Sequence, residues 1–250
     1  MTLFELVPSL HRVGTPRIDR AIWPLTTHVD ETGRLCIGGV ALTEVADEFR
    51  TPAYVLDEAD FRYRIERYRA ALPGVSVAYA GKSLLTTAVA HWVSQEGLGL
   101  DICSGGELAT ALAAGVDRAR IIMHGNAKTP DELSDAATVG VDRIVVNSPI
   151  EIALLAGRVR KHQRVLLRVI PNIDIHGHRA LTTGVIDQKF GFALEGGHAA
   201  AAVKRILDQP LLDGHPIRTG WRRIVRPVAV TDVFQRPKIT AFSLRMSQTG

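Results

Sequence analysis

Short apolar runs alternate with amphipathic segments through the middle of the chain. The runs typical of buried strands are 75–80, 99–103, 121–124, 143–146 and 164–169. The segments between them space their apolar residues as helices do, at 86–95, 104–115, 129–140 and 148–159. Each strand begins about 22 residues after the previous one, and this pitch predicts a parallel sheet with helices packed outside it.

The predicted helices begin at residues that favour those positions. Ser104 can cap one helix, and the pairs Thr129-Pro130 and Ser148-Pro149 each combine a capping hydroxyl with a proline in the first turn. Glu132 and Glu151 stand three residues after their caps, where a carboxylate supports the start of a helix.

The N-terminal part is less regular. Residues 1–34 show little periodicity, and a short strand is predicted for Leu35–Val40. Thr43 is expected to cap a helix that ends near Phe49. Ala53–Leu56 then resembles a strand, and Asp57 is expected to cap a longer helix over 58–72.

Two architectures fit the central alternation, an open doubly wound sheet and a closed barrel. No Gly-x-Gly-x-x-Gly follows a predicted strand, which counts against the dinucleotide-binding form of the open sheet. From the alternation alone both architectures stay open.

Side chains able to do chemistry follow the predicted strands. They are Lys82, Asp101 with Glu107, His124 with Asn126, and Arg168. In a barrel the carboxyl ends of the strands form the face where active sites are built. The chain has only six lysines against 24 arginines. Only the lysine amine can lose its proton near neutral pH when it is desolvated, as Schiff-base chemistry with a carbonyl cofactor requires. The alternative is an ordinary lysine at the exit of a strand.

Four segments follow one another in the order Tyr79-Ala80-Gly81-Lys82, Asp101–Leu108, His124–Lys128 and Asp187–Gly191. They resemble the YA(A/G)K, D(V/I)CSGGEL, HGNNK and DQKFG motifs of the pyridoxal-phosphate (PLP) decarboxylases of the alanine-racemase-like fold. The spacing is that of the family. The resemblance is strongest to its diaminopimelate decarboxylases and covers roughly residues 20–213.

The resemblance decides for the barrel. It implies an α/β fold, a PLP-binding TIM-type (β/α)8 barrel that is truncated after about five strands, with Ala53–Leu56 in an N-terminal segment of a small β domain. The implied domains are 1–57, the partial barrel 58–213 and a divergent basic tail 214–250. The family also implies a homodimer.

By the same resemblance, Lys82 is the catalytic residue that carries PLP, which acts as an electron sink. The cofactor-binding residues are Lys82, Asp101, Glu107, His124, Asn126 and Arg168. A strand-end turn for Asp101 and a dipole-favoured first-turn acid for Glu107 are the alternative roles. The implied reaction uses a small amino acid as substrate and converts meso-2,6-diaminopimelate to L-lysine.

The family pattern stops after residue 213. A complete enzyme of this kind continues with an HxHIGS-like strand, a glycine-rich phosphate loop, an EPGR-like segment and a C-terminal β domain, and 214–250 contains none of them. A shift of reading frame would give such an arginine-rich, aperiodic tail. We therefore expect a truncated decarboxylase. Its alternatives are a PLP-binding protein without turnover and a decarboxylase of another basic amino acid.

A histidine pair in Ile175-His176-Gly177-His178, near Asp174, has the residue types of a metal site. No third and fourth ligand follow at a recognisable spacing, so no metal is predicted. Lys189 is expected either in an ion pair between subunits, as the resemblance implies, or as a solvated loop charge.

Composition sets the remaining bounds. Hydrophobic residues make up 46% and charged residues 22%, as in ordinary soluble proteins. No apolar run approaches the ~20 residues of a membrane span, and no signal peptide is recognised, so we expect a cytoplasmic protein with no membrane partner. The two cysteines, Cys36 and Cys103, make no disulfide framework, and Cys103 is expected to be a small buried residue.

Charge is concentrated at one end. Residues 214–250 hold seven lysines and arginines against one acid, and the net charge of +4 comes from this tail. A basic tail can bind nucleic acid, but no nucleic-acid partner is predicted.

Overall fold

The computed structural model describes residues 18–170 and 191–214, together with the backbone of β12 (Phe242–Arg245). The chain divides into two compact units, Met1–Leu72 and Pro73–Gly250. Among the residues described, no helix has both the length and the apolar character needed to cross a membrane.

The N-terminal unit contains a small antiparallel sheet and two helices. Its elements are β1 (His28–Val29), β2 (Leu35–Ile37), β3 (Val40–Ala41), α2 (Leu42–Phe49) and α3 (Glu58–Ala71). The strands pair in the order β1-β2-β3. An open groove of about 760 Å³ in this unit is lined in part by Val40, Phe49, Val55 and Leu56.

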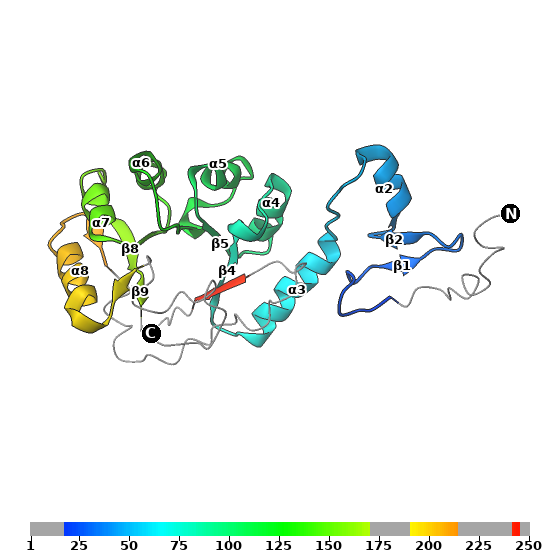
Figure 1. The fold of residues 1–250 in the computed structure, drawn as a ribbon, viewed down its shortest axis with the longest axis horizontal. Coiled ribbons are helices and arrows are strands. Elements are labelled where there is room, and N and C mark those ends of the chain that lie inside the picture. Colours follow the sequence, from blue (N-terminus) through cyan, green and yellow to red (C-terminus); the bar gives the residue numbers. More distant parts are fainter. Residues whose placement is uncertain (1–17, 171–190, 215–241, 246–250) are drawn as a thin grey trace, which may run out of the picture. The chain divides into compact units, whose positions relative to one another are not determined.

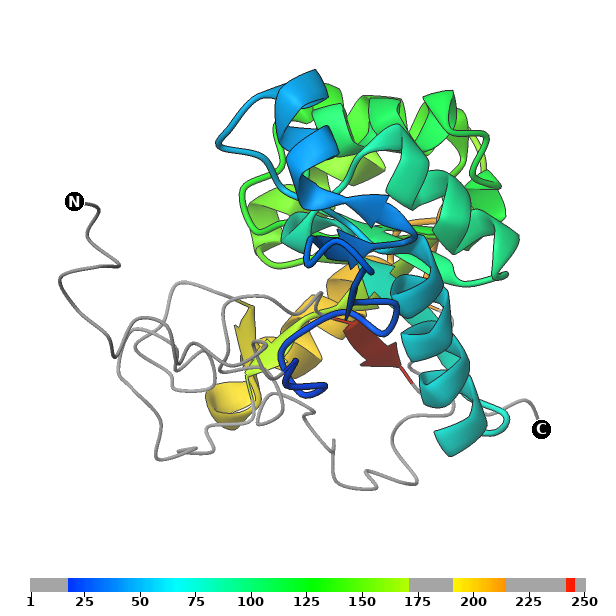
Figure 2. The same cartoon turned by 90° about the vertical axis from the view of Figure 1, so that its right-hand side faces the viewer.

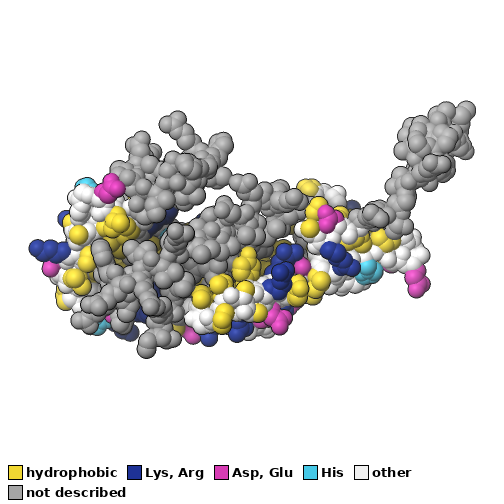
Figure 3. Space-filling view, turned by 90° about the horizontal axis from the view of Figure 1, so that it is seen from below, with side chains coloured by type: hydrophobic (Ala, Val, Ile, Leu, Met, Phe, Trp, Pro, Cys, Tyr) yellow, Lys and Arg dark blue, Asp and Glu magenta, His cyan; other side chains and the backbone are white. Residues whose placement is uncertain are grey.

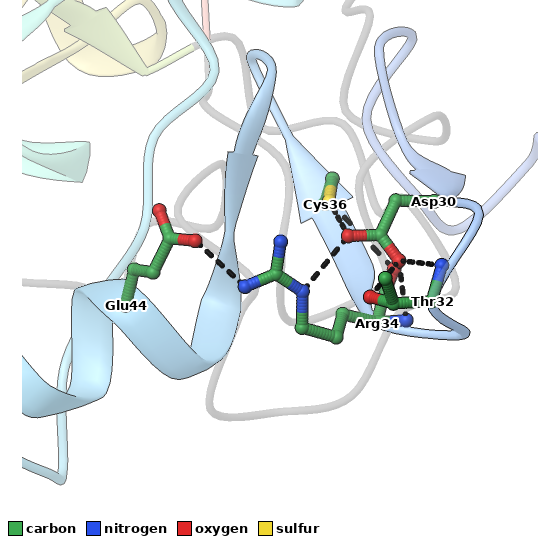
Figure 4. Close-up of polar contacts among 5 residues, drawn as sticks. All are labelled: Asp30, Thr32, Arg34, Cys36 and Glu44. Atoms are coloured by element: carbon green, nitrogen blue, oxygen red, sulfur yellow. Dashed lines mark hydrogen bonds and ion pairs between the residues drawn. The ribbon is translucent and has the colours of Figure 1, made fainter.

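The turn between β1 and β2 is held by Asp30 (Figure 4). Its Oδ1 atom accepts hydrogen bonds from the backbone N–H groups of Thr32 and Arg34, at 3.0 and 2.8 Å. Arg34 reaches Asp30 Oδ2 at 2.8 Å with Nε and Glu44 Oε1 at 2.7 Å with its Nη1 atom. These contacts connect the hairpin to α2, and the hydrogen bonds from Arg34 and Thr32 hold the pKa of Asp30 well below its ordinary value.

The sequence predicted this unit only in part. Asp57 caps α3 as expected, accepting from the N–H groups of Ala59 and Asp60. The prediction of a strand at Ala53–Leu56 was wrong, because these residues are exposed and pair with no strand. The prediction of Thr43 as a helix cap was also wrong, because α2 begins at Leu42 and its N-cap residue is Ala41, without a side-chain cap.

The second unit is built on a parallel sheet. Its strands, in chain order, are β4 (Ser76–Ala80), β5 (Gly99–Ile102), β6 (Ile121–Met123), β7 (Arg143–Val146), β8 (Gln163–Leu167) and β11 (Leu212–Asp213). They lie in the order β11-β8-β7-β6-β5-β4, and each pairs in parallel with its neighbour. A separate parallel pair joins β9 (Val169–Ile170) and β10 (Phe192–Ala193).

The intervening helices are α4 (Thr87–Gln95), α5 (Gly105–Ala113), α6 (Pro130–Val139), α7 (Pro149–Ala156) and α8 (His198–Leu207). Each contacts the next along the chain. Helices α4 to α7 lie on one side of the strands (Figures 1 and 2). Ser104, Thr129 and Ser148 cap their helices as predicted, and Thr129 and Glu132 complete a capping box.

The strands bury both faces. Ala78, Ile122 and Val145 form a cluster against which Leu166 packs. Neighbouring residues point the other way. They include Tyr79, Leu100, Ile121 and Ile144, each 0% exposed. The helix residues Val89, Leu133 and Leu155 are also fully buried, which places a second apolar layer between sheet and helices.

Both edges of the sheet differ from the sequence-based expectation. The last predicted strand was 164–169, but β11 pairs in parallel with β8 and extends the sheet. The tail was expected to lack periodic structure, but β12, the red strand in Figure 1, pairs antiparallel with β4. In this pairing Phe242 is opposite Tyr79. An α/β fold with a partial parallel barrel is confirmed.

On the described surface, hydrophobic side chains alternate with side chains of both charges over the face drawn in Figure 3.

Candidate functional site

The carboxyl ends of β4, β5 and β6 lie side by side. Ala80 is in register with Asp101, and Asp101 with Ile122. Lys82, Asp101 and His124 therefore stand at the same end of the sheet, as the sequence predicts for a parallel arrangement. Arg168 lies between β8 and β9 at that end, where its N–H donates to Val146 O at 3.1 Å.

Lys82 sits in a three-residue turn, Gly81–Ser83, directly after β4. Gly81 is buried, but the Lys82 side chain is exposed. The sequence-based argument assumed instead that this lysine is desolvated. A Cβ atom on Gly81 would lie 3.2 Å from Asp101 O and 3.4 Å from Glu107 Oε2. Glycine therefore lets the turn lie close to the end of β5.

Asp101 and His124 form a polar pair. Their Oδ2 and Nδ1 atoms are 3.2 Å apart, and the Asp101 side chain is 7% exposed while the His124 side chain is 26% exposed. A carboxylate can only accept, so the imidazole presents an Nδ1–H group to it. His124 is anchored through its backbone as well, because its N–H donates to Ile102 O at 2.6 Å.

Glu107 supports the same corner from α5. Its Oε2 atom accepts from the Cys103 N–H at 2.6 Å, which satisfies a donor at the start of the helix. Cys103 is half-buried rather than buried as expected. Burial raises the pKa of its thiol, with further contributions from the carboxylates of Asp101 and Glu107 that Lys82 and Lys128 partly oppose. The four charged side chains are thus within electrostatic range of the Cys103 thiol.

Lys128 is a residue of this region that the sequence reasoning did not single out. Its side chain is 0% exposed, and its Nζ atom lies 2.6 Å from Gly125 O, 2.7 Å from Val145 O and 3.1 Å from Glu151 Oε1. Burial lowers the pKa of Lys128, and the Glu151 carboxylate opposes that shift. The sequence feature that could have drawn attention to Lys128 is the one used for Lys82, the rarity of lysine in an arginine-rich chain.

Asn147 extends the Lys128 contacts to β7. It is buried, its Nδ2 atom donates to Gly125 O at 2.7 Å, and its N–H donates to Glu151 Oε2 at 2.7 Å. Gly125 has a φ of 85°, and a Cβ atom there would lie 2.7 Å from Cys103 O. These contacts therefore connect the ends of β5, β6 and β7 at the end of the sheet where the residues expected to bind the cofactor lie.

The remaining predicted residues are less tightly placed. Asn126 is exposed in the loop after β6. Arg168 is half-buried, and burial lowers the pKa of its guanidinium. The histidine pair at 176 and 178 and Lys189 lie outside the described residues. Within the described part, no three His, Cys, Asp or Glu side chains are placed to hold a metal ion.

The two lysines at this end differ in what they offer a ligand. Lys128 is enclosed by three oxygen atoms. Lys82 is exposed at the same end, directly after Gly81, which lies close to Asp101 O and Glu107 Oε2. An aldehyde cofactor needs an accessible primary amine, so this donor set fits PLP at Lys82 and not at Lys128.

Comparisons with known proteins also indicate pyridoxal phosphate as the cofactor. The chain is 49% identical over 212 residues to a diaminopimelate decarboxylase of Actinosynnema pretiosum, covering 85% of this chain and 48% of that protein. It is 46% identical over 189 residues to the diaminopimelate decarboxylase of Mycobacterium tuberculosis H37Rv, covering 74% and 42%. The chain thus spans about half the length of the curated relatives it matches.

Solved structures show the same partial coverage. A diaminopimelate decarboxylase from M. jannaschii, in complex with L-lysine, superposes with a TM-score of 0.68 at 29% identity, covering 75% of this chain and 46% of that one. The model of the pyridoxal-binding domain of pyridoxal-dependent decarboxylases matches residues 58–213, more than half of the chain. With the strand ends, the exposed lysine and these matches taken together, the chain belongs to the pyridoxal-dependent decarboxylases, whose cofactor is pyridoxal phosphate.

Proposed function

We propose that this chain binds PLP through Lys82 and provides the PLP-binding half of an enzyme that decarboxylates meso-2,6-diaminopimelate to L-lysine. The observation that carries the proposal is the exposed Lys82 at the strand ends, at the same end of the sheet as the part-buried Asp101–His124 pair. The substrate is inferred from the curated relatives, which are named diaminopimelate decarboxylases.

The reaction breaks one carbon–carbon bond. Carbon dioxide leaves, and a proton takes its place on the α-carbon. When bound, PLP supplies the electron sink for the electron pair that remains after carbon dioxide departs. The chain's own contribution is to hold and orient the groups around that carbon.

Each candidate residue has a role that its position supports. Lys82 would hold the aldehyde carbon of the cofactor. His124 would line the cofactor site in the orientation that its Nδ1 contact with Asp101 Oδ2 gives the ring. Arg168 would face the phenolic oxygen of the cofactor, and Glu107 and Asn126 would line its surroundings.

A second function has one observation in its favour. The matched region is the pyridoxal-binding domain, and the chain covers 42–48% of the relatives' length. PLP binding without turnover would follow if the rest of the site has to come from elsewhere. A homodimer and a basic amino acid other than diaminopimelate stay proposals as well.

The test is reductive labelling of the purified chain. The protein is titrated with PLP, reduced with sodium borohydride, and digested, and the modified lysine is located by peptide mass spectrometry. We expect modification of Lys82. The absorbance band that appears when the chain is titrated with PLP should be lost in Lys82→Ala. Both results should be unchanged in Lys161→Ala, which removes an exposed lysine elsewhere. Equal labelling of several lysines, or a band unchanged in Lys82→Ala, would rule the proposal out.

Turnover is measured separately, as carbon dioxide released from meso-diaminopimelate, with ornithine and arginine as competing substrates. Release from diaminopimelate alone supports the full proposal. Labelling of Lys82 without release from any of them supports PLP binding without turnover.

A further inference from the structure

Two hydroxyl groups, those of Tyr79 and Ser83, hold the turn that carries Lys82. The Tyr79 hydroxyl donates to Leu84 O at 2.7 Å, on the far side of the turn. The Ser83 hydroxyl lies 2.7 Å from Ala80 O and 3.1 Å from the Tyr79 hydroxyl oxygen. These contacts join the residues before the turn to those after it, so they fix both ends of the segment Gly81–Ser83.

Each hydroxyl has one proton, and this determines which hydroxyl donates to which oxygen. Tyr79 has one proton and uses it on Leu84 O. Ser83 also has one, which is shared between Ala80 O and the Tyr79 oxygen. The Tyr79 hydroxyl therefore donates to Leu84 O and accepts from Ser83.

Tyr79 is itself held rigidly. It lies in β4 between β5 and β12, paired in register with Leu100, and is 0% exposed. Burial raises the pKa of its phenol, so the hydroxyl keeps the proton that Leu84 O requires over the whole physiological range. Lys82, by contrast, is exposed.

We propose that Tyr79 is a positioning residue for Lys82, and that its hydroxyl, together with that of Ser83, holds the turn so that the amine points to one place at the strand ends. The inference rests on the proposed function, since it concerns how Lys82 meets a PLP aldehyde. Preorganisation of this kind lowers the ordering cost when a ligand binds. Tyr79 would act through Lys82 and would not touch the substrate.

The test compares Tyr79→Phe, Ser83→Ala and Ser83→Thr with the wild-type chain. Phenylalanine keeps the buried ring and removes only the hydroxyl. Threonine keeps a hydroxyl at 83, where the side chain is exposed and a methyl group can be accommodated. Tyr63→Phe is the matched control, because it removes a tyrosine hydroxyl from an exposed position on α3.

Two readouts are measured on each protein. The first is amide hydrogen exchange of residues 82–85 without PLP. The second is the PLP concentration that gives half-maximal borohydride labelling of Lys82. We expect Tyr79→Phe and Ser83→Ala to raise both by about tenfold, in line with the loss of a part-buried hydrogen bond, and Ser83→Thr and Tyr63→Phe to leave both close to wild type.

The outcomes separate this inference from the proposed function. If wild-type Lys82 is not labelled at all, the proposed function fails, and the exchange data still decide whether Tyr79 holds the turn. If exchange in Tyr79→Phe equals wild type, or if exchange rises while half-maximal labelling is unchanged, the positioning role is overturned. A fall in thermal stability with unchanged labelling would likewise show a structural role only.

Discussion

The ammonium group of Lys128 lies 3.1 Å from Glu151 Oε1, and the two side chains are 0% and 7% exposed. Lys128 follows β6 and Glu151 lies in the first turn of α7, so the pair joins two successive strand–helix units. Lys128 also binds the carbonyl oxygens of Gly125 and Val145. Through these contacts it fixes the loop that begins at His124.

Removing the charge of Lys128 should destabilise the protein strongly. Lys128→Met leaves the Glu151 carboxylate buried without its partner, and we expect a loss of about 3–5 kcal/mol in the free energy of unfolding. Urea denaturation followed by circular dichroism measures it. The double variant Lys128→Met/Glu151→Gln removes both charges and should recover more than half of the loss. Lys161→Met is the surface control, and a loss below about 1 kcal/mol in Lys128→Met would contradict the assignment.

Asp101 should decide the tautomer of His124. In the wild-type chain the carboxylate accepts from Nδ1, so the neutral imidazole should be the Nδ1–H form. Asp101→Ala removes the acceptor, and the predominant form should change to Nε2–H. The ¹⁵N chemical shifts of the His124 ring, compared with those of the exposed His162, report it. Identical His124 shifts in the two proteins would show that the pair does not form in solution.

Glu132 should contribute to stability only above acidic pH. Hydrogen bonds from the N–H groups of Thr129 and Gly105 lower its pKa below the ordinary 4.5. A depressed pKa in the folded state stabilises the protein above the unfolded-state value and loses that effect as the pH falls. The advantage of wild type over Glu132→Gln, measured as a difference in melting temperature, should therefore be constant from pH 6 to about 5 and shrink below about 4.5. A difference independent of pH would mean that the carboxylate does not make these bonds.

Tyr79 should act in the opposite direction at alkaline pH. Burial raises its pKa above the ordinary 10.0. A raised pKa in the folded state stabilises the protein fully below the unfolded-state value, and that contribution is lost as the pH rises through the folded-state value. The advantage of wild type over Tyr79→Phe should hold up to about pH 10 and decrease above it. An advantage that persists unchanged to pH 11.5 would show that the phenol is not desolvated.

Local sequence patterns were sufficient for most of the second unit. The caps at Ser104, Thr129 and Ser148 and the apolar periods predicted where α5, α6 and α7 begin. Hydrogen bonds within a few residues determine such features, and a short window of sequence contains all of their partners. Strand–helix alternation also predicted that Lys82, Asp101 and His124 would stand at one end of the sheet, because parallel strands place their carboxyl ends together.

Features that depend on distant partners were not predictable in this way. Ala53–Leu56 has strand-like residues but finds no strand to pair with, whereas the short β11 forms because β8 offers it an edge. The sequence also could not predict that Lys82 is exposed and Lys128 is buried, since both lysines follow predicted strands.

The sequence by itself thus determined the order of strands and helices, the helix caps and the end of the sheet at which the reactive side chains gather, because these follow from local periodicity and chain direction. Only the tertiary structure decided which lysine is enclosed and which is open. That choice depends on the Glu151 carboxylate and the Val145 carbonyl reaching Lys128 from the next strand–helix unit, and no comparable set of oxygens surrounds Lys82 among the described residues.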